Sequence, residues 1–412
     1  MLKIVVQKFG GSSVATAPLR ENAIRHVSRA MGEGLRPVVV VSAMGRKGDP
    51  YATDTLVGLA REAGDSDGSR ELDLLMSCGE VVSAAIMALT MKRRGLPAVA
   101  LTGAQAGITT DNQFGEARVL WVSTDRLLRE LEDGNIPVIT GFQGITTNGD
   151  ITTLGRGASD TSAAVVGVAL GAELVEIFTD VDGVKTADPR VVPQAVTLER
   201  MTYSEVVEMA LLGARVVHPR AVQIAREGRV PLKIRCTAGD GSGTLITDGR
   251  VPGRNGEVTN DRLVVGIAHV PGRAQIRLDM TAATQEAVPA AFFQALGDAG
   301  ISVDMIGVSP SQLRVTIASS HVEMARGVLG RLSLPVEIVP GFAKVSVVGA
   351  GMHGVPGVMA RVAGALASVG VLIYQSTDSH ANISCLVREE EAALAIATLH
   401  SEFQLHVVGS DR

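Results

Sequence analysis

The fold is decided by one stretch, Thr152-Thr153-Leu154-Gly155-Arg156-Gly157-Ala158-Ser159-Asp160-Thr161-Ser162-Ala163-Ala164. It starts as a β-prone run, turns on two glycines and enters an apolar, alanine-rich helix candidate. Glycines let the backbone approach a ligand closely, and the helix N-terminus offers unpaired N–H groups. Arg156 adds a planar, positively charged guanidinium group that can bind a carboxylate or a phosphate, and the acidic Asp160 follows four residues later. The alternative is a structural joint in which Ser159 or Asp160 caps the helix.

The same alternation of strand and helix continues on both sides of this stretch, from residue 2 to residue 236. Several of the strands are continuous apolar runs, which indicates burial on both faces. The pattern predicts an α/β protein whose mostly parallel sheet has helices on both faces. The predicted strands are 2–8, 37–41, 98–101, 137–140, 174–179 and 231–236, and the predicted helices are 19–31, 56–63 and 72–91.

The first predicted strand runs into a glycine loop, Lys8-Phe9-Gly10-Gly11-Ser12-Ser13-Val14. Backbone N–H groups between a strand and a helix can hold a phosphate, although this loop has neither common phosphate-binding glycine spacing. Lys8 could neutralise charge on a phosphoryl group during transfer. The alternative is a solvated lysine beside a structural turn.

Further polar candidates follow the strands or lie on the long helix. Loops at the carboxyl ends of parallel strands are where α/β proteins bind ligands, and Ser42-Ala43-Met44-Gly45 is such a loop. Glu80 follows small residues that would let it face a cleft, the alternative being a solvated glutamate. Cys78 lacks a histidine or helix-start context for a nucleophile, and His218 before a proline is typical of a loop or packing residue.

Composition excludes several classes of protein. The chain has 412 residues, enough for two or three domains, and a net charge of −5 without a basic patch, which argues against nucleic-acid binding. Its three cysteines are far apart and indicate reduced thiols in a cytosolic setting. We find no signal-peptide pattern and no apolar run of the ~20 residues that a membrane helix needs. The sequence therefore predicts a soluble cytoplasmic protein.

The C-terminal part contains an internal repeat. Residues 238–262 are rich in glycine, aspartate and asparagine, as is typical of a linker. Beyond it, the stretch 295–303 aligns with 365–373, and each copy has the order helix, glycine stop, strand, strand, helix, strand. This order predicts two small α+β modules of βαββαβ type. Without catalytic residues, they point to effector binding and regulation, or alternatively to dimerisation alone.

Seven motifs in order resemble the aspartokinases, whose catalytic part has the amino-acid-kinase fold, and the tail resembles their paired ACT domains. The resemblance covers essentially the whole chain and comes closest to the diaminopimelate-responsive aspartokinases of spore-forming bacteria, through residues 42–54, 75–80 and 378–380. The motifs are Lys8 to Val14, Ser42 to Gly45, Gly79-Glu80, Gly141 to Gly144, Thr153 to Asp160, Thr179 to Val184 and Gly213 to Pro219.

The resemblance implies an amino-acid-kinase domain at 1–240, a linker at 241–262 and ACT domains at 263–340 and 341–412. It implies transfer of the γ-phosphoryl group of MgATP to the side-chain carboxylate of L-aspartate, with Mg²⁺ carried by the nucleotide rather than held by a metal motif of the chain. This is the first step toward lysine, diaminopimelate, threonine and methionine. It further implies feedback by an amino acid bound to the ACT domains, and a homodimer or higher homo-oligomer. Such a reaction depends on positioning two anions and neutralising their charge.

Site residues carry over from the resemblance position by position. Lys8 is expected to stabilise the transferring phosphoryl group, and Asp160 to orient Lys8 or help hold the metal. Arg156 is expected to bind a carboxylate of aspartate, and Glu80 its α-ammonium group. Further substrate contacts are expected at Ser42, Thr53, Phe142, Gly157 and Ser159, and ATP contacts at Lys8, Gly10, Gly11, Ser12, Thr179, Asp180, Lys185, Arg190 and Arg215.

Departures from the family pattern concern the nucleotide and effector sites. Ala158 stands where glycine is common, Lys185 where tyrosine is frequent and Arg215 where lysine is frequent. In the tail, a frequent glutamine–asparagine pair is replaced by Val308-Ser309. The expected regulatory positions are Thr284, Gln285, Val308, Ser309, Asp378 and Ser379. Their changed identities favour diaminopimelate as the effector over lysine or threonine.

Two other functions are compatible with parts of the sequence. One is an amino-acid kinase for a different carboxylate or a carbamate, which the Glu80 and Arg156 pair and the ACT-like repeats argue against. The other is a non-catalytic sensor whose kinase half has decayed. Against decay, Lys8, Asp160 and Asp180 are all intact.

Overall fold

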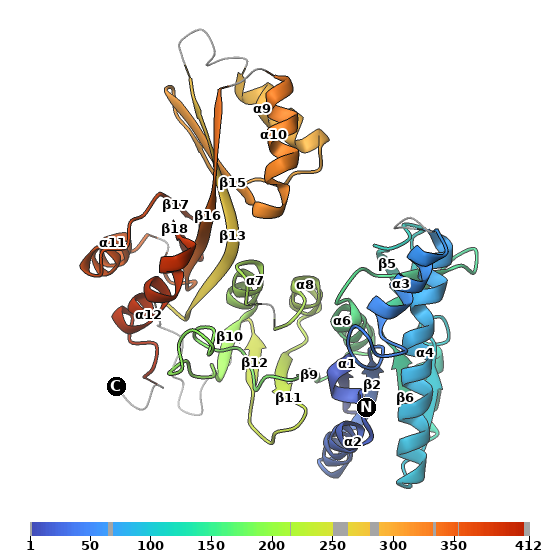
Figure 1. Ribbon diagram of the computed structural model, residues 1–412. Coiled ribbons are helices and arrows are strands. Elements are labelled where there is room, and N and C mark those ends of the chain that lie inside the picture. Colours follow the sequence, from blue (N-terminus) through green and yellow to red (C-terminus); the bar gives the residue numbers. More distant parts are fainter. Residues whose placement is uncertain are drawn as a thin grey trace. The chain divides into compact units, whose positions relative to one another are not determined.

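The computed structural model describes residues 2–64, 69–214, 216–249, 263–280, 288–332, 335–352 and 354–407. The chain divides into two compact units (Figure 1). The first unit comprises Met1–Val184, Thr197–Ala210 and Arg215–Thr259. The second unit comprises Lys185–Val196, Leu211–Ala214 and Asn260–Arg412.

The first unit is built on an eight-stranded sheet with the order β10-β12-β11-β9-β1-β2-β6-β3. The six strands from β11 to β3 are all parallel to their neighbours, and only β12 runs antiparallel to β11. The predicted mostly parallel sheet is therefore confirmed. The strands are β1 (Ile4–Phe9), β2 (Arg36–Val41), β3 (Ala98–Leu101), β6 (Ile136–Thr140), β9 (Leu174–Thr179), β10 (Arg200–Thr202), β11 (Leu232–Cys236) and β12 (Thr244–Thr247).

Helices pack on both faces of this sheet, as its two-sided apolar strands require. On one face, α2 (Ala17–Gly32) and α4 (Arg70–Arg93) share a core with Phe9 and Phe178. On the other face, α6 (Ser159–Ala169) lies against β1 and β9, and α8 (Pro219–Gly228) packs on α6. A Cβ at Gly167 would lie 2.3 Å from Val175, so glycine permits this close approach. The remaining helices of the unit are α1 (Gly11–Val14), α3 (Thr53–Glu62), α5 (Asp125–Glu132) and α7 (Tyr203–Leu211).

A second, four-stranded sheet in the first unit was not predicted from the sequence. Its order is β5-β4-β7-β8, from β5 (Val119–Val122), β4 (Ile108–Thr110), β7 (Gln143–Thr146) and β8 (Ile151–Thr153). These strands have only three or four residues each, too few to establish a clear alternation of apolar and polar positions. The stretch from Thr152 to Ala164 begins in β8, so this sheet supports the glycine turn around Arg156.

The predicted linker is partly a strand. Residues 244–247, assigned to the linker from the glycine-rich composition around them, form β12, which pairs with both β10 and β11. Thr244 and Ile246 are fully buried there, because their β-branched side chains face the core while their neighbours face outward. Residues 250–262 of the predicted linker lie outside the described residues.

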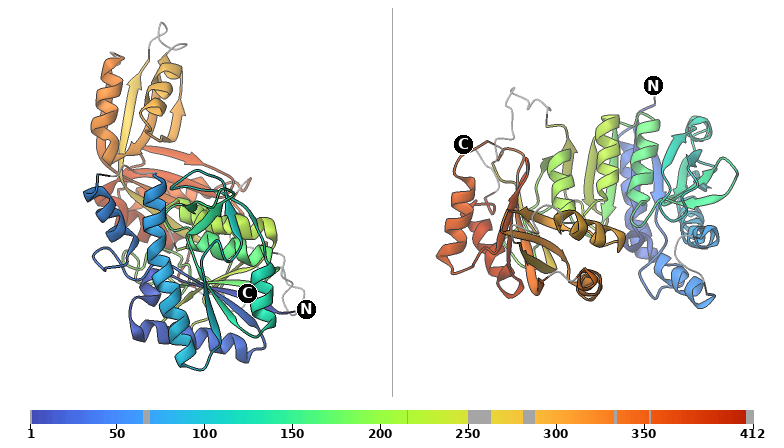
Figure 2. Two further views of the ribbon diagram at one scale, coloured as in Figure 1. Left: turned by 90° about the vertical axis from the view of Figure 1, so that its right-hand side faces the viewer. Right: turned by 90° about the horizontal axis from the view of Figure 1, so that it is seen from above.

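The second unit is built on a six-stranded antiparallel sheet with the order β14-β15-β13-β16-β18-β17. Its two longest strands, β13 (Gly266–Asp279) and β16 (Val336–Val348), pair along most of their length. Figures 1 and 2 show both strands running from the half that carries α9 and α10 to the half that carries α11 and α12. The other strands are β14 (Asp304–Val308), β15 (Gln312–Ala318), β17 (Gln375–Asp378) and β18 (Asn382–Arg388).

Each half of the second unit has its own hydrophobic core, in agreement with the sequence repeat. α9 (Val288–Asp298) and α10 (Val322–Arg331) cover one core, and α11 (Val358–Ser368) and α12 (Ala392–Glu402) cover the other. In the described part of the chain, no strand follows α12. The beginning of β13, residues 266–270, pairs with the end of β16 and supplies the fourth strand of that half.

The segment 185–196, which follows β9 and its loop, belongs to the core of the α11–α12 half. Ala187, Val192 and Ala195 are buried in it. Thr186 shares a hydrogen bond of 2.9 Å with the Nε2 atom of His400 on α12, and its carbonyl oxygen accepts one of 2.7 Å from the Ile267 N–H. Residues next to the predicted nucleotide site are thus built into the second unit.

One described helix, α4, is long and apolar enough to cross a membrane by length and composition. Half of the 18-residue apolar stretch in this helix is buried inside the protein. Its buried face carries the acidic side chains of Asp73 and Glu80. Charged groups of this kind are costly in hydrocarbon. The contacts of α4 with β3, β6 and β8 make it a core helix of the first unit.

Candidate active site

The predicted site residues gather at the carboxyl edge of the parallel sheet. The strand register pairs Phe9 of β1 with both Val41 of β2 and Phe178 of β9, and Val41 with Thr140 of β6. All four strands therefore end at one level. The loops that carry the predicted residues leave the sheet side by side, at the edge where α/β proteins bind ligands.

Lys8 and Asp160 form the ion pair at the centre of this edge. The Nζ atom of Lys8 lies 2.7 Å from Oδ1 of Asp160, and both side chains are about nine-tenths buried. Alternation along β1 points Lys8 to the same face as Val6, which is the face covered by α6. Asp160 lies in the first turn of α6, where the helix dipole favours a negative charge. The structure thus brings together the two residues predicted to be catalytic.

The loop from Gly10 to Ser12 lies tightly against the loop after β2. A Cβ at Gly11 would be 2.5 Å from the Ala43 carbonyl oxygen, and the Gly45 N–H donates to the Gly11 carbonyl oxygen at 3.1 Å. Position 11 therefore requires glycine. Gly10 lies beside Lys8, since a Cβ there would be 3.5 Å from Nζ. Ser12 is half-buried in the short helix α1.

Glu80 is a buried carboxylate in which only one of the two oxygens has a hydrogen-bond partner among the described residues. Its Oε1 atom accepts a hydrogen bond of 3.0 Å from the Ala43 N–H, while Oε2 is buried without a hydrogen-bond partner among the described residues. Burial raises the pKa of Glu80 from an ordinary 4.5 to about 8. Gly79 lets α4 approach closely enough, because a Cβ there would lie 2.8 Å from the Tyr51 carbonyl oxygen. A buried oxygen without a partner favours a cationic ligand at this point.

Arg156 lies on the turn between β8 and α6, where Gly155 and Gly157 both have positive φ angles of 90° and 78°. Its Nη1 atom lies 2.6 Å from Oδ1 of Asp54, which is in the first turn of α3. The guanidinium is largely exposed and can be reached by a ligand. An exposed pair of this kind is weak, so Asp54 is an internal carboxylate that a carboxylate substrate can replace.

The other predicted substrate residues surround this turn. Ser42 directly follows β2, and its N–H donates to the Phe9 carbonyl oxygen at 3.1 Å. Thr53 is the first residue of α3, next to Asp54, and Ser159 is the buried first residue of α6. Phe142 has a positive φ of 69° and a buried side chain that packs in the core of α3 and α4. Phe142 thus supports the turn through packing and backbone bonds.

The predicted nucleotide residues divide between the two units. Thr179 and Asp180 end β9 in the first unit, where Asp180 Oδ2 pairs with Arg46 at 2.9 Å. Lys185 and Arg190 belong to the second unit. In that unit, Arg190 forms a bidentate ion pair with Asp188, and the hydrogen bonds from Arg190 lower the pKa of the Asp188 carboxyl group. Arg215 lies outside the described residues.

Asp73 of α4 was missed by the sequence analysis. It is fully buried, and its carboxylate accepts hydrogen bonds from the Gly115 N–H at 3.0 Å and from the Thr153 N–H and hydroxyl group at 2.7 Å. Burial raises the pKa of Asp73, and these hydrogen bonds oppose that shift. Thr153 ends β8 just before the Arg156 turn, so Asp73 fixes the base of this turn. A lone helical aspartate gives no such signal in sequence.

His218 also contributes, through its backbone. Its N–H donates to Asp160 Oδ2 at 3.0 Å and thereby orients the carboxylate that pairs with Lys8. Its imidazole caps α8 by accepting from the Arg220 N–H, and burial lowers the pKa of the ring. The sequence-based interpretation of His218 as a loop and packing residue agrees with this cap.

Four of the predicted regulatory positions are described, and they lie at equivalent hairpins of the two halves of the second unit. Val308 and Ser309 end β14, and Asp378 and Ser379 end β17. Ser309 closes its turn through Gln312, and Ser379 closes the matching turn through Asn382. The two copies of the sequence repeat therefore close their turns with equivalent hydrogen bonds from a serine. Thr284 and Gln285 lie outside the described residues.

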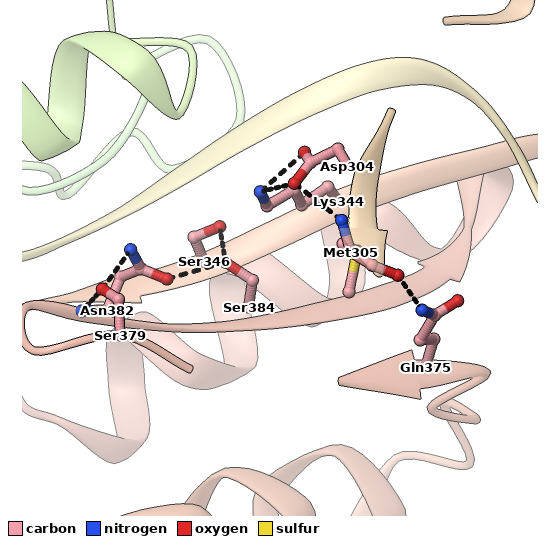
Figure 3. A network of polar contacts seen from close by, with 8 residues as sticks. All are labelled: Asp304, Met305, Lys344, Ser346, Gln375, Ser379, Asn382 and Ser384. Atoms are coloured by element: carbon pink, nitrogen blue, oxygen red, sulfur yellow. Dashed lines mark hydrogen bonds and ion pairs between the residues drawn. The ribbon is translucent and has the colours of Figure 1, made fainter. Parts of the chain in front are cut away.

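Two groups of polar contacts lie on the second unit's sheet (Figure 3). Lys344 of β16 pairs with Asp304 of β14 at 2.7 Å, and Gln375 of β17 donates to the Met305 carbonyl oxygen. β14 and β17 are the two edge strands of the sheet, so Gln375 connects one edge to the other. The second group joins Ser346, Ser384 and Asn382 to Ser379 of the β17–β18 turn.

Comparisons with known proteins agree with both units. The amino acid kinase family matches residues 3–236, and the ACT domain matches residues 337–401. Aspartokinase 1 of Bacillus subtilis is 44% identical over 404 residues, covering 98% of this chain and all of that protein. E. coli aspartokinase III, solved with aspartate and ADP, matches with a TM-score of 0.76 and 26% identity over 97% of this chain and 99% of its own. The chain therefore belongs to the aspartokinase family: it is an aspartate kinase with ACT-domain regulation.

Proposed function

We propose that Lys8 and Asp160 form the catalytic centre for transfer of the γ-phosphoryl group of ATP to the side-chain carboxylate of L-aspartate. The observation that carries this proposal is the buried ion pair of 2.7 Å at the carboxyl edge of the sheet. Phosphoryl transfer between two anions requires a fixed positive charge at the transferring group. Lys8 supplies that charge, while Asp160, held by the His218 N–H, keeps the ammonium group in position.

Aspartate recognition is assigned to Glu80 and Arg156. The free Oε2 atom of Glu80 accepts the α-ammonium group, and Arg156 binds a carboxylate in place of Asp54. Because the pKa of Glu80 is about 8 in the empty site, Glu80 loses a proton when the ammonium group binds near neutral pH. A site that binds an ammonium group and a carboxylate at a fixed separation selects an α-amino acid. Ser42, Thr53, Gly157 and Ser159 complete the substrate site, and Phe142 supports it.

ATP is assigned to the edge between β1 and β9. The backbone of Gly10 and Gly11 and the hydroxyl of Ser12 are assigned to the phosphates, and Thr179 and Asp180 to the rest of the nucleotide. Lys185, Arg190 and Arg215 are nucleotide contacts that the resemblance alone implies. The cation is proposed to be Mg²⁺, which prefers oxygen ligands and the phosphates of the nucleotide. The carboxylates of Asp160 and Asp180 fit that preference. When bound, Mg²⁺ neutralises phosphate charge, while Lys8 provides the fixed charge of the protein.

The regulatory ligand is proposed to be diaminopimelate, bound at the hairpins of the ACT halves. E. coli aspartokinase III has been solved with lysine and aspartate in a T state, which supports an amino acid as the class of effector. Here the exposed Val308 and Asp378 alter that surface relative to the family pattern. An effector acts only through a difference in affinity between two states, typically of about 1–3 kcal/mol.

Assembly, location and domain limits complete the proposal. We expect a homodimer formed through the self-complementary ACT halves, in the cytoplasm. The catalytic domain covers about 1–240, followed by a linker and two ACT domains at 263–340 and 341–412. The two cores refine this division, because residues 266–270 add a strand to the α11–α12 half.

Trapping of the acyl phosphate by hydroxylamine tests the catalytic proposal. Purified protein, MgATP and L-aspartate should give a hydroxamate that depends on aspartate. Lys8→Met should abolish it, while Lys3→Met, at an exposed lysine directly before the same strand, should leave it unchanged. Hydroxamate with another acid and none with aspartate would assign a different substrate. No hydroxamate with any acid would identify a sensor instead of a kinase.

The same assay with effectors tests the regulatory proposal. Diaminopimelate should lower the rate, with lysine and threonine as parallel additions. Unchanged activity and ATP affinity at saturating levels of all three amino acids would contradict effector binding at the ACT halves. Inhibition by lysine or threonine alone would keep the site and change its ligand.

A further inference from the structure

Thr237 lies just beyond the carboxyl end of β11 and contacts two segments of the first unit that carry predicted nucleotide residues. It directly follows Cys236, which the strand register pairs with Thr179 at the end of β9. Its buried Oγ1 atom lies 2.6 Å from Oγ of Ser13 and 3.2 Å from the carbonyl oxygen of Thr179. Because a hydroxyl group has one proton and two lone pairs, both contacts are satisfied when Thr237 donates to the carbonyl oxygen and accepts from Ser13.

Ser13 fixes the position of the glycine loop after β1. Its N–H donates to the Gly10 carbonyl oxygen at 2.8 Å, and its side chain is buried. On the side of β2, the loop is held by the Gly45 N–H. On the side of β9, the Gly10 N–H reaches the Phe178 carbonyl oxygen at 3.3 Å, a long hydrogen bond. The shorter contact between Ser13 and Thr237 therefore strengthens the link between the loop and β9.

The backbone of Thr237 is itself held in place on both sides of its side chain. Its N–H donates to the Thr179 carbonyl oxygen at 2.9 Å. Its carbonyl oxygen accepts a hydrogen bond of 3.0 Å from Nε2 of His26, a buried residue of α2 whose ring lies 4.5 Å from that of Phe178. The Thr237 hydroxyl group cannot turn away without leaving buried polar groups unpaired, which is costly.

We propose that Thr237 is a positioning residue for ATP, whose hydroxyl group holds the glycine loop against the end of β9. This inference rests on the proposed function, which assigns ATP to the edge between β1 and β9. Phosphoryl transfer depends on positioning, so a loop that shifts away from β9 should bind the phosphates less tightly. Thr237 acts through Ser13 and not by contact with aspartate, because Glu80 and Arg156 belong to other elements of the site.

The first unit contains a second buried hydroxyl pair that serves as a matched control. Thr110 of β4 and Thr152 of β8 lie 2.6 Å apart, the same distance as Thr237 and Ser13, and both are buried. Thr110→Val and Thr237→Val each remove one hydroxyl group from such a pair and keep the shape of the side chain. Both variants should lose thermal stability, but Thr237→Val alone should lose affinity for ATP.

Isothermal titration calorimetry of the full chain with MgATP, in the absence of aspartate, tests this difference. Thr237→Val should bind MgATP about tenfold more weakly than the native chain, while Thr110→Val should bind it with native affinity. Thr237→Ser, which keeps the hydroxyl group, should bind within about twofold of the native chain. Equal affinities in Thr237→Val and Thr110→Val, or a Thr237→Ser variant no better than Thr237→Val, would overturn the proposal.

Ser13→Ala gives an independent test from the other side of the contact. It should weaken MgATP binding in the same direction, and the double variant with Thr237→Val should be little weaker than the weaker single variant. In steady-state kinetics, KM for ATP should rise while KM for aspartate changes by less than about twofold. Additive losses in the double variant, or equal rises in both KM values, would assign a general structural role to Thr237.

The two readouts separate this inference from the proposed reaction. Hydroxamate formed from aspartate by the native chain, together with native ATP affinity in Thr237→Val, would keep the reaction and refute the role of Thr237. Weakened MgATP binding in Thr237→Val, with no hydroxamate from any acid in the native chain, would support the role of Thr237 and refute the reaction. A native chain that does not bind MgATP would refute both.

Discussion

Two lysine–aspartate pairs in this protein have the same length and different surroundings. Lys8 and Asp160 of the first unit lie 2.7 Å apart, as do Lys344 and Asp304 of the second unit. Both lysine side chains are about nine-tenths buried. Lys8 is flanked by a glycine loop, a helix N-terminus and the ends of four parallel strands. Lys344 lies on β16, which has antiparallel strands on both sides, and its partner Asp304 also accepts from the Met305 N–H (Figure 3).

The difference suggests a physical reason why we assign catalysis to only one of the two pairs, namely which other groups lie beside it. At Lys8, Gly10 has no side chain beside Nζ, and Glu80 on the same edge has an oxygen without a hydrogen-bond partner among the described residues. At Lys344, every neighbouring group of the network has a partner within the second unit. We therefore expect the first pair to control turnover, and the second to control stability and the response to effectors.

The largest effect is expected at Lys8. Lys8→Met should lower kcat by at least about a hundredfold, because it removes a charge aimed at the transferring group. Asp160→Asn should lower kcat less, since the lysine remains but is no longer held. Steady-state kinetics with ATP and aspartate measures both. A normal kcat in Lys8→Met would remove the distinction between the two pairs.

A large and pH-dependent effect is expected at Glu80. Since the pKa of free Glu80 is about 8, aspartate binding must release a proton at lower pH, and KM for aspartate should fall by nearly tenfold from pH 6 to pH 7 and by a smaller factor from pH 7 to pH 8. Glu80→Gln should raise KM strongly and remove this dependence. A flat pH profile of KM in the native protein would contradict the assignment.

Glu80 should also affect stability, in the opposite sense to activity. The folded protein holds the Glu80 proton more tightly than the unfolded chain, so this contribution is full below about pH 4.5 and is lost as the pH rises toward 8. Glu80→Gln should therefore melt at a higher temperature than the native protein at pH 8, with a smaller difference at pH 5. Thermal unfolding at the two pH values measures this, and an equal difference at both would contradict burial as the cause.

The pair of Lys344 and Asp304 is expected to affect stability rather than turnover. Asp304→Asn leaves Lys344 buried without its counter-charge and should destabilise the second unit by about 1–3 kcal/mol. The basal kcat should change by less than twofold, and inhibition by the effector should weaken. Calorimetry and inhibition curves provide these values. A loss of kcat as large as that of Lys8→Met would mean that the two pairs have the same role.

A moderate effect on positioning is expected at Asp73. Asp73→Asn leaves buried N–H groups at Gly115 and Thr153 without acceptors, which costs about 1–3 kcal/mol. If Asp73 acts through the Arg156 turn, KM for aspartate should rise more than KM for ATP. Thr153→Val, which removes only the hydroxyl bond, should show the same direction with a smaller size. Equal changes in both KM values would indicate a general structural role.

The smallest effect is expected at Asp54. Because its carboxylate occupies Arg156 in the absence of substrate, Asp54→Asn should lower KM for aspartate by up to about fivefold, the size of an exposed ion pair. A rise in KM would show that Asp54 assists substrate binding instead of competing with it.

Much of the first unit could be predicted from sequence because its strands are continuous apolar runs. Val38 to Val41 and Leu174 to Thr179 are unambiguous, and their ends indicate the level at which the loops after Phe9 and Val41 leave the sheet. The contact between Lys8 and Asp160 could be expected only from the resemblance, since the two residues are far apart in sequence. The structure places them in contact.

Other features depend on tertiary context and could not be predicted. No local sequence pattern marks Asp73 as structurally important, because its hydrogen-bond donors Gly115 and Thr153 are distant in sequence. The strands of the four-stranded sheet are too short for a period to be recognised. The exchange of residues 266–270 into the α11–α12 half depends on which edge is unpaired after folding, and a sequence repeat contains no information on that choice.

The most direct test compares hydroxamate formation from aspartate and MgATP in Lys8→Met and Lys344→Met. We predict that Lys8→Met has no detectable rate and remains folded, while Lys344→Met retains the native rate and loses part of its inhibition by diaminopimelate. A native rate in Lys8→Met, or an equal loss of rate in both variants, would contradict the assignment of catalysis to the pair at the edge of the parallel sheet.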